Sequence, residues 1–251
     1  MKTAQEWVTE LTNGKDQAWP NIKRAEMVSG LKARLAKPSV IDQANTSLCG
    51  PASLMYCLAT AKDAVYAQYV VELYQTGKAT LGKLTVQPGS SCKRYAATAG
   101  DRIHPVDWVT LAGLRDSEND SFDYDTPSAE VGGITMPGDL IDWFKDSGFS
   151  KDTNKTNLVF NKWHEDLVEA GSKYLQGHSV CLFINANMLN SPKEGSAFPD
   201  HWVVLASPVK TVARTACAEF TIFTWGGTRD VSIRVEYLSK NFYGYISSSS
   251  S

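Results

Sequence analysis

The sequence has no long apolar run. Its longest candidate, residues 180–189, includes two asparagines and falls well short of the roughly 18 apolar residues that a membrane-spanning helix needs. The segment from Met1 to Trp7 also lacks the apolar core of a secretory signal peptide. We therefore expect a protein made in the cytoplasm without a membrane span, and export by a route that needs no cleavable signal remains open.

Neither sign of charge is in large excess. The chain carries 25 basic and 27 acidic side chains, for a net charge of −2, and the basic ones are scattered. Binding to nucleic acid requires a clustered basic surface that neutralises phosphates, so nucleic acid is excluded as the main partner. With 251 residues, of which 43% are apolar, the chain is long enough to bury a sizeable core.

The sequence also lacks the usual signatures of disulfide, metal and phosphate sites. Its cysteines are odd in number and show no paired spacing, which excludes a disulfide framework and favours a reducing compartment of synthesis. They are Cys49, Cys57, Cys92, Cys181 and Cys217. No Cys-x-x-Cys or His-x-x-x-His spacing occurs, and Gly226-Gly227 has neither the lysine nor the helix of a phosphate loop. We predict no metal and no cofactor.

Helical patterns fill the first two thirds of the chain, and strand patterns follow. Two amphipathic helices precede residue 38, with Asn21 as the expected N-cap of the second, and further helices are expected over 54–61, 63–75, 105–115, 137–147 and 161–176. Strands are expected over 180–186, 203–206, 219–224, 231–237 and 242–246. This order predicts an α+β fold.

We interpret the chain as one domain, residues 1–251. It comprises a helical lobe over about 1–178, a lobe of antiparallel strands over about 179–246, and a disordered serine tail over 247–251. Residues 80–160 form an insertion in the helical lobe.

Cys49 has the setting of a catalytic nucleophile. A thiol attacks a carbonyl as the thiolate, so its pKa must fall below the usual value of about 8.5. Gly50-Pro51 follows Cys49 directly and fits the first turn of a helix, whose positive dipole end favours the thiolate. Cys57, Cys181 and Cys217 instead lie in apolar patterns and are interpreted as core residues.

His201 is the best candidate for the base, because it opens an apolar strand. An imidazole there could take the thiol proton and later protonate the leaving group. The other histidines fit worse: His104 precedes a proline in a turn, His164 lies on an exposed helix face, and His178 lacks the apolar run that follows His201.

Gln43 stands six residues before Cys49. The tetrahedral intermediate of acyl transfer needs donors for its oxyanion, and a side-chain amide together with the nucleophile's backbone N–H would supply them. Gln43 is the candidate for that amide.

Together these residues resemble the papain-like cysteine peptidase superfamily. The local sequences Cys49-Gly50-Pro51-Ala52-Ser53 and His201-Trp202-Val203-Val204-Leu205 are most similar to bacterial double-glycine (bacteriocin-leader) peptidases. The resemblance implies that the nucleophile helix packs on a C-terminal antiparallel sheet carrying the histidine, with the cleft between the two lobes.

The third catalytic residue departs from the family pattern. The family has an asparagine or aspartate that orients the imidazole, followed by a Trp-Gly pair similar to Trp225-Gly226, but Phe223 occupies the asparagine position. Either the site is a Cys–His dyad, or Thr224 or Asp230 takes the third role.

The resemblance implies a cysteine hydrolase of peptide or amide bonds. Its bacterial members include secreted effectors and toxins, so cell-wall peptides or a host protein are the implied substrates and an immunity protein the implied partner. Two alternatives remain: a deamidase, transglutaminase or acyltransferase on the same fold, and a catalytically decayed binding protein.

Overall fold

The computed structural model describes residues 2–98, 100–118, 126, 134–160, 162–195, 198–212, 214 and 216–250. The chain forms two compact units. The helical unit comprises Met1–Thr135 and Asp146–Gly148, and the sheet unit comprises Met136–Lys145 and Phe149–Ser251. The division therefore falls earlier in the chain than the boundary near residue 178 that the sequence suggests.

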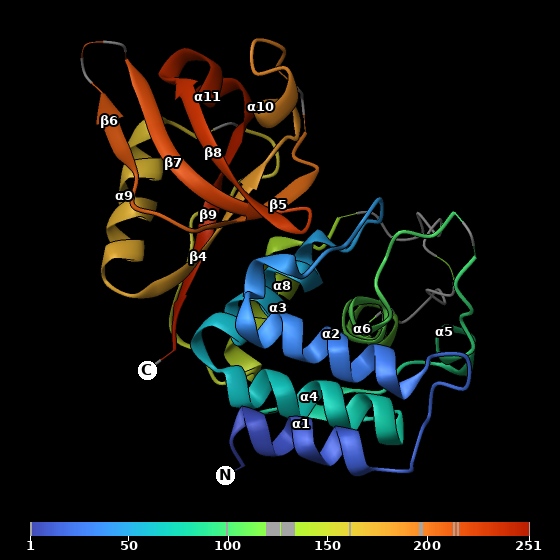
Figure 1. Ribbon diagram of the computed structural model, residues 1–251. Helices are drawn as coiled ribbons and strands as arrows, with labels where there is room; N and C mark the ends of the chain where they lie inside the picture. The colour runs from blue at the N-terminus through green and yellow to red at the C-terminus, as the bar shows by residue number, and fades with distance from the viewer. Residues whose placement is uncertain are drawn as a thin grey trace. The chain divides into compact units, whose positions relative to one another are not determined.

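The helical unit is built mainly of helices (Figure 1). They are α1 (Ala4–Asn13), α2 (Arg24–Ala36), η1 (Pro38–Val40), α3 (Cys49–Ala61), α4 (Asp63–Thr76) and α5 (Ser90–Lys93). A small hairpin follows α4, with strands β1 (Ala79–Leu81) and β2 (Leu84–Val86). The run α6 (Pro105–Asp107), η2 (Trp108–Ala112) and α7 (Gly113–Ser117) is continuous, and η2 is a π-helical stretch within it.

Helix α3 is the buried centre of this unit. Ten of its residues are buried, and they lie on every side of the helix because the sequence is apolar almost throughout. It contacts α2, α4, η1 and η2. The expected helix after Cys49 is confirmed, and it begins at Cys49 itself.

The expected cap of α2 is wrong. The side chain of Asn21 donates a hydrogen bond of 2.7 Å to the carbonyl of Arg94, and the helix begins three residues later at Arg24. The first turn is closed instead by Glu26, whose carboxylate accepts from the backbone N–H of Lys23 at 3.2 Å. The Asn21 side chain is used in a contact with a distant segment and does not cap the helix.

The sheet unit combines a curled antiparallel sheet with helices. Its helices are α8 (Pro137–Asp146), α9 (His164–Leu175), α10 (Asn187–Asn190) and α11 (Val235–Asn241). Its strands are β3 (Ser150–Asn154), β4 (His178–Ile184), β5 (His201–Leu205), β6 (Lys210–Val212), β7 (Cys217–Thr224), β8 (Gly227–Arg234) and β9 (Phe242–Ser249). The strand order is β3-β9-β4-β5-β7-β6, and β8 pairs with β7. The α+β class is confirmed.

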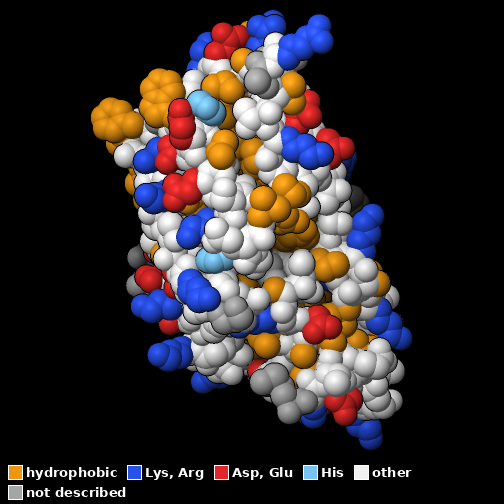
Figure 2. Space-filling view, turned by 90° about the vertical axis from the view of Figure 1, so that its left-hand side faces the viewer, with side chains coloured by type: hydrophobic (Ala, Val, Ile, Leu, Met, Phe, Trp, Pro, Cys, Tyr) orange, Lys and Arg blue, Asp and Glu red, His pale blue; other side chains and the backbone are white. Residues whose placement is uncertain are grey.

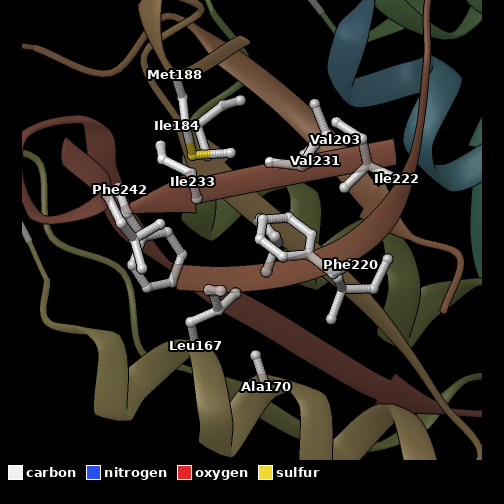
Figure 3. Packing of buried hydrophobic residues seen from close by; sticks show 14 of the residues in the cluster. Leu167, Ala170, Ile184, Met188, Val203, Phe220, Ile222, Val231, Ile233 and Phe242 are labelled. Atoms are coloured by element: carbon white, nitrogen blue, oxygen red, sulfur yellow. The ribbon is translucent and has the colours of Figure 1, made fainter. Parts of the chain in front are cut away.

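Helix α9 covers one face of this sheet. Leu167 and Ala170 point from the helix toward the strands, where Phe220 and Ile222 lie on the same face of β7 (Figure 3). Alternate residues of a strand point to opposite faces, so the even-numbered positions of β7 supply the core. Each such side chain contributes roughly 1.5–3 kcal/mol when fully buried.

The disordered serine tail is a wrong prediction for residues 247–249. These serines complete β9, where Ser247 pairs with Val180 of β4 on one side and Thr153 of β3 on the other. All three are buried. Backbone pairing on both sides orders this segment, whatever its low-complexity composition.

A second correction concerns residues 235–237, expected as strand. Strand β8 ends at Arg234, and α11 begins at Val235, whose N–H donates to the carbonyl of Ala216 at 2.8 Å. Across the ranges that the structure describes, no helix is long and apolar enough to cross a membrane.

Candidate functional site

Cys49 is the first residue of α3 and is only 3% exposed. Its carbonyl accepts a hydrogen bond of 2.8 Å from the hydroxyl of Ser53, one turn later. Gly50 permits close packing, because a Cβ at this position would come within 2.2 Å of the Thr135 hydroxyl oxygen. The thiol therefore lies at the positive end of a 13-residue helix whose first turn is tightly enclosed.

Gln43 is buried in the loop that leads into α3. Its side-chain N–H donates to the carbonyl of Thr46 at 2.7 Å, and the Thr46 hydroxyl donates back to the Gln43 carbonyl at 2.6 Å. A carboxamide nitrogen carries two hydrogens, and this arrangement uses one of them. The loop therefore holds the carboxamide in one orientation.

His201 opens β5 in the sheet unit, opposite Ile184 of β4, and is 4% exposed. Its Nε2 lies 2.7 Å from the hydroxyl oxygen of Thr224. Burial lowers the pKa of His201 to about 4, since a charged imidazolium would lose its hydration. The imidazole is consequently neutral at physiological pH, and it is a weaker base than an exposed histidine.

The Thr224 hydroxyl can orient this ring. When Nε2–H donates to the hydroxyl, the lone pair remains on Nδ1, and among the described residues no group bonds to Nδ1. A hydroxyl can also donate, so it selects the tautomer less strictly than the family's carboxamide or carboxylate would. Thr224 therefore contacts the ring at Nε2 through a group that can either donate or accept.

Trp225 covers the imidazole. Its ring is stacked on His201 with centroids 4.4 Å apart and ring planes 10° apart, while the side chain is 40% exposed. Trp225 and Gly226 form the two-residue turn between β7 and β8, at φ values of 43° and 71°. Positive φ suits glycine but costs another residue roughly 1–2 kcal/mol. The chain holds Trp225 in this strained conformation above His201.

The two tentative third residues differ in what they contact. Thr224 reaches His201, but Asp230 lies opposite Thr221 on the neighbouring strand and accepts its hydroxyl hydrogen bond at 2.7 Å. Phe223 cannot take the role, because adjacent strand residues face opposite sides and Thr224 is on the side of His201.

The remaining histidines have other contacts. His104 caps α6, where its Nδ1 accepts the N–H of Val106 at 3.2 Å. His164 is paired with Glu165 on the surface, its Nδ1 3.2 Å from the carboxylate, and His178 begins β4. Asp200, next to His201, accepts from the backbone N–H of Ala186 at 2.7 Å, as a loop carboxylate would.

Two features of this arrangement were not predicted from the sequence. The cover by Trp225 was missed, although a Trp-Gly pair between two strand patterns marks a tight turn that could have suggested it. The anchoring of the Gln43 loop by Asp107 was also missed, and it gave no local signal because Asp107 lies inside a helical pattern.

Within the part of the chain that the structure describes, no three His, Cys, Asp or Glu side chains are grouped to hold a metal ion. Basic and acidic side chains are interspersed on the face shown in Figure 2. No protein-family model, curated protein or solved structure matches this chain.

Proposed function

We propose that this protein is a cysteine-dependent hydrolase of peptide or amide bonds with a papain-like arrangement of residues. The observation that carries the proposal is His201: a neutral, buried imidazole, bonded through Nε2 to Thr224 and covered by Trp225. The start of α3 at Cys49 and the fixed amide of Gln43 supply the other two roles.

The reaction would form and break bonds in two stages. The Cys49 sulfur attacks the carbonyl carbon while its proton passes to Nδ1 of His201, and the oxyanion accepts hydrogen bonds from Gln43 and the Cys49 N–H. Collapse of the intermediate expels the amine, which takes the proton from His201 and leaves a thioester. Water then attacks the thioester, gives a proton to His201, and releases the acid as the thiol re-forms.

The substrate class follows from the resemblance to bacterial leader peptidases. Under this proposal the protein is a secreted bacterial effector that cleaves cell-wall peptides or a host protein and is held inactive by an immunity protein. Purified peptidoglycan peptides and peptides with a double-glycine site are the first substrates to test. Release of a new amine would show cleavage, whereas a mass increase of about one dalton on a glutamine would show a deamidase.

An electrophilic thiol probe tests the nucleophile. A peptide vinyl sulfone should label the wild-type protein at Cys49, and Cys49→Ala should abolish the label. Cys57→Ala is the matched control, because Cys57 is buried in the same helix two turns later. Equal labelling of another cysteine would overturn the assignment.

The proposed pairing of the Cys49 thiol with the His201 imidazole needs a separate test. The bifunctional reagent 1,3-dibromoacetone alkylates a thiol with one carbon and a nearby imidazole with the other. The proposal predicts a crosslinked peptide that joins Cys49 to His201, detected by mass spectrometry. Labelling of Cys49 without any crosslink to His201 would assign the base elsewhere.

A further inference from the structure

A buried ion pair lies behind the loop that carries Gln43. Arg34 of α2 and Asp107 of α6 are both buried. The guanidinium donates two hydrogen bonds to the carboxylate, from Nε to Oδ1 at 2.7 Å and from Nη2 to Oδ2. Arg34 also donates to the carbonyl of Gly30 at 3.1 Å. This fork-to-fork geometry fixes the orientation of the carboxylate.

The same carboxylate holds the backbone beside Gln43. Oδ2 of Asp107 accepts a hydrogen bond of 3.0 Å from the backbone N–H of Asp42. Hydrogen bonds to an ionised acceptor are stronger than those between neutral groups, and the accepting carboxylate is fully buried. Asp42 is the residue immediately before Gln43.

The rest of the loop is bonded mainly to itself. The Asp42 side chain accepts the N–H of Ala44 at 2.8 Å, Ala44 takes a positive φ of 53°, and Gln43 and Thr46 exchange their two hydrogen bonds. Among hydrogen bonds of residues 42–47 that the described structure shows, the one to Asp107 is the link to another element.

Asp107 is also joined to the helix of Cys49. Helix α6 continues directly into η2, and η2 contacts α3. One continuous run of chain therefore contacts both the loop with the amide and the helix with the thiol.

We propose that Asp107 is a positioning residue, which sets the place of the Gln43 amide relative to Cys49 through the backbone N–H of Asp42. This inference rests on the proposed function, since it assigns Gln43 to the oxyanion. It gives the buried carboxylate a role beyond stability, since replacing a buried ion pair by apolar residues of similar volume is often neutral for stability.

The test compares Asp42→Pro with Asp42→Ala. Both lose the side chain that accepts from Ala44, but only proline lacks the N–H that reaches Asp107. Ile41 already has φ −61° and ψ 123°, a conformation compatible with a following proline. The two variants therefore differ in the N–H that reaches Asp107 and in the fixed φ of proline, and the acceptor variants described below change the hydrogen bond without changing the backbone.

Two reagents separate positioning from simple loss of structure. Acylation of Cys49 by p-nitrophenyl acetate passes through an oxyanion, whereas alkylation by iodoacetamide does not. The ratio of the two rates should fall about tenfold or more in Asp42→Pro relative to Asp42→Ala, with alkylation unchanged, because loss of an oxyanion donor costs about 10²–10³ in rate. An equal ratio in both variants would overturn the proposal.

A second pair of variants changes the acceptor of the Asp42–Asp107 hydrogen bond and leaves the donor intact. Arg34→Met/Asp107→Leu removes the charges and the acceptor together, while Arg34→Met/Asp107→Asn removes the charges and keeps an oxygen for Asp42. The ratio should fall in the leucine variant and stay within about threefold of wild type in the asparagine variant. Equal ratios in these two variants would also overturn the proposal.

The wild-type protein separates this inference from the proposed function. If p-nitrophenyl acetate acylates wild type no faster than Cys49→Ala, the proposed function itself is wrong. If acylation depends on Cys49 but either pair of variants gives equal ratios, only the role of Asp107 is wrong.

Discussion

The indole of Trp225 lies parallel to the imidazole of His201, with ring centroids 4.4 Å apart. The low pKa of His201 has burial as its cause, and Trp225 is part of the cover. Trp225→Asn should therefore raise the pKa of His201 from about 4 toward 6.5, since asparagine tolerates the turn's positive φ but exposes the ring. The chemical shift of the imidazole Cε1–H, followed against pH, measures this change.

Trp225→Phe is the matched control, because it keeps an aromatic ring over the imidazole. Its His201 should titrate close to the wild-type value. A pKa that stays near 4 in Trp225→Asn would mean that other neighbours, and not the indole, exclude water from the imidazole.

The low pKa of His201 also predicts an acid sensitivity. The unfolded chain binds a proton at about pH 6.5, but the folded protein resists it until about pH 4, so stability is full above pH 6.5 and falls as the pH drops between these values. The gap corresponds to about 3 kcal/mol. Urea unfolding at several pH values should show this loss in wild type and a smaller one in His201→Gln. Parallel pH profiles in the two proteins would contradict the prediction.

Thr224→Val should slow the acylation of Cys49 by about three- to tenfold, the value of one hydrogen bond, because the imidazole loses the group that orients it. Thr224→Ser keeps the hydroxyl and should keep the rate. Thr224→Asn introduces a carboxamide oxygen that can accept from Nε2–H, and its rate is expected to match or exceed that of wild type. Burst kinetics with p-nitrophenyl acetate measure all three, and an unchanged rate in Thr224→Val would leave the site as a dyad.

Gly50→Ala should lower the free energy of unfolding by about 1–3 kcal/mol, because the new methyl group would meet the Thr135 hydroxyl at 2.2 Å. Gly138→Ala is a suitable control, since nothing lies within 4 Å of its added Cβ. That variant should be neutral or more stable, as alanine favours the helix. Thermal denaturation compares the stability of the two variants. A Gly50→Ala protein as stable as wild type would show that the Thr135 side chain can move aside without cost.

Local patterns predicted the elements that carry the candidate site. The apolar run of α3, the proline near its start, and the alternation after His201 are all short-range signals, and both elements were found where they were expected. The position of the third residue was not predictable in the same way. It depends on β5 pairing with β7 in a particular register, which places Thr224 on the side of His201.

The errors have the same origin. The sequence pattern predicted that Asn21 caps a helix, but its side chain instead donates a hydrogen bond to a carbonyl 73 residues away. Ser247 to Ser249 show no apolar periodicity, and their order comes from pairing with β3 and β4. Asp107 fits a helical pattern, yet its function in the fold depends on Arg34 and Asp42. Interactions between distant segments leave no trace in a local pattern.

The strand order has a consequence for biosynthesis. Strand β9 lies between β3 and β4, although it is the strand of the sheet furthest along the chain. During translation β3 therefore leaves the ribosome long before the neighbour that it needs, and the pairings of β9 close loops that are slow to form. The sheet that holds His201 can be completed only after β9 has emerged, so it is expected to assemble later than the helices that precede it in the chain.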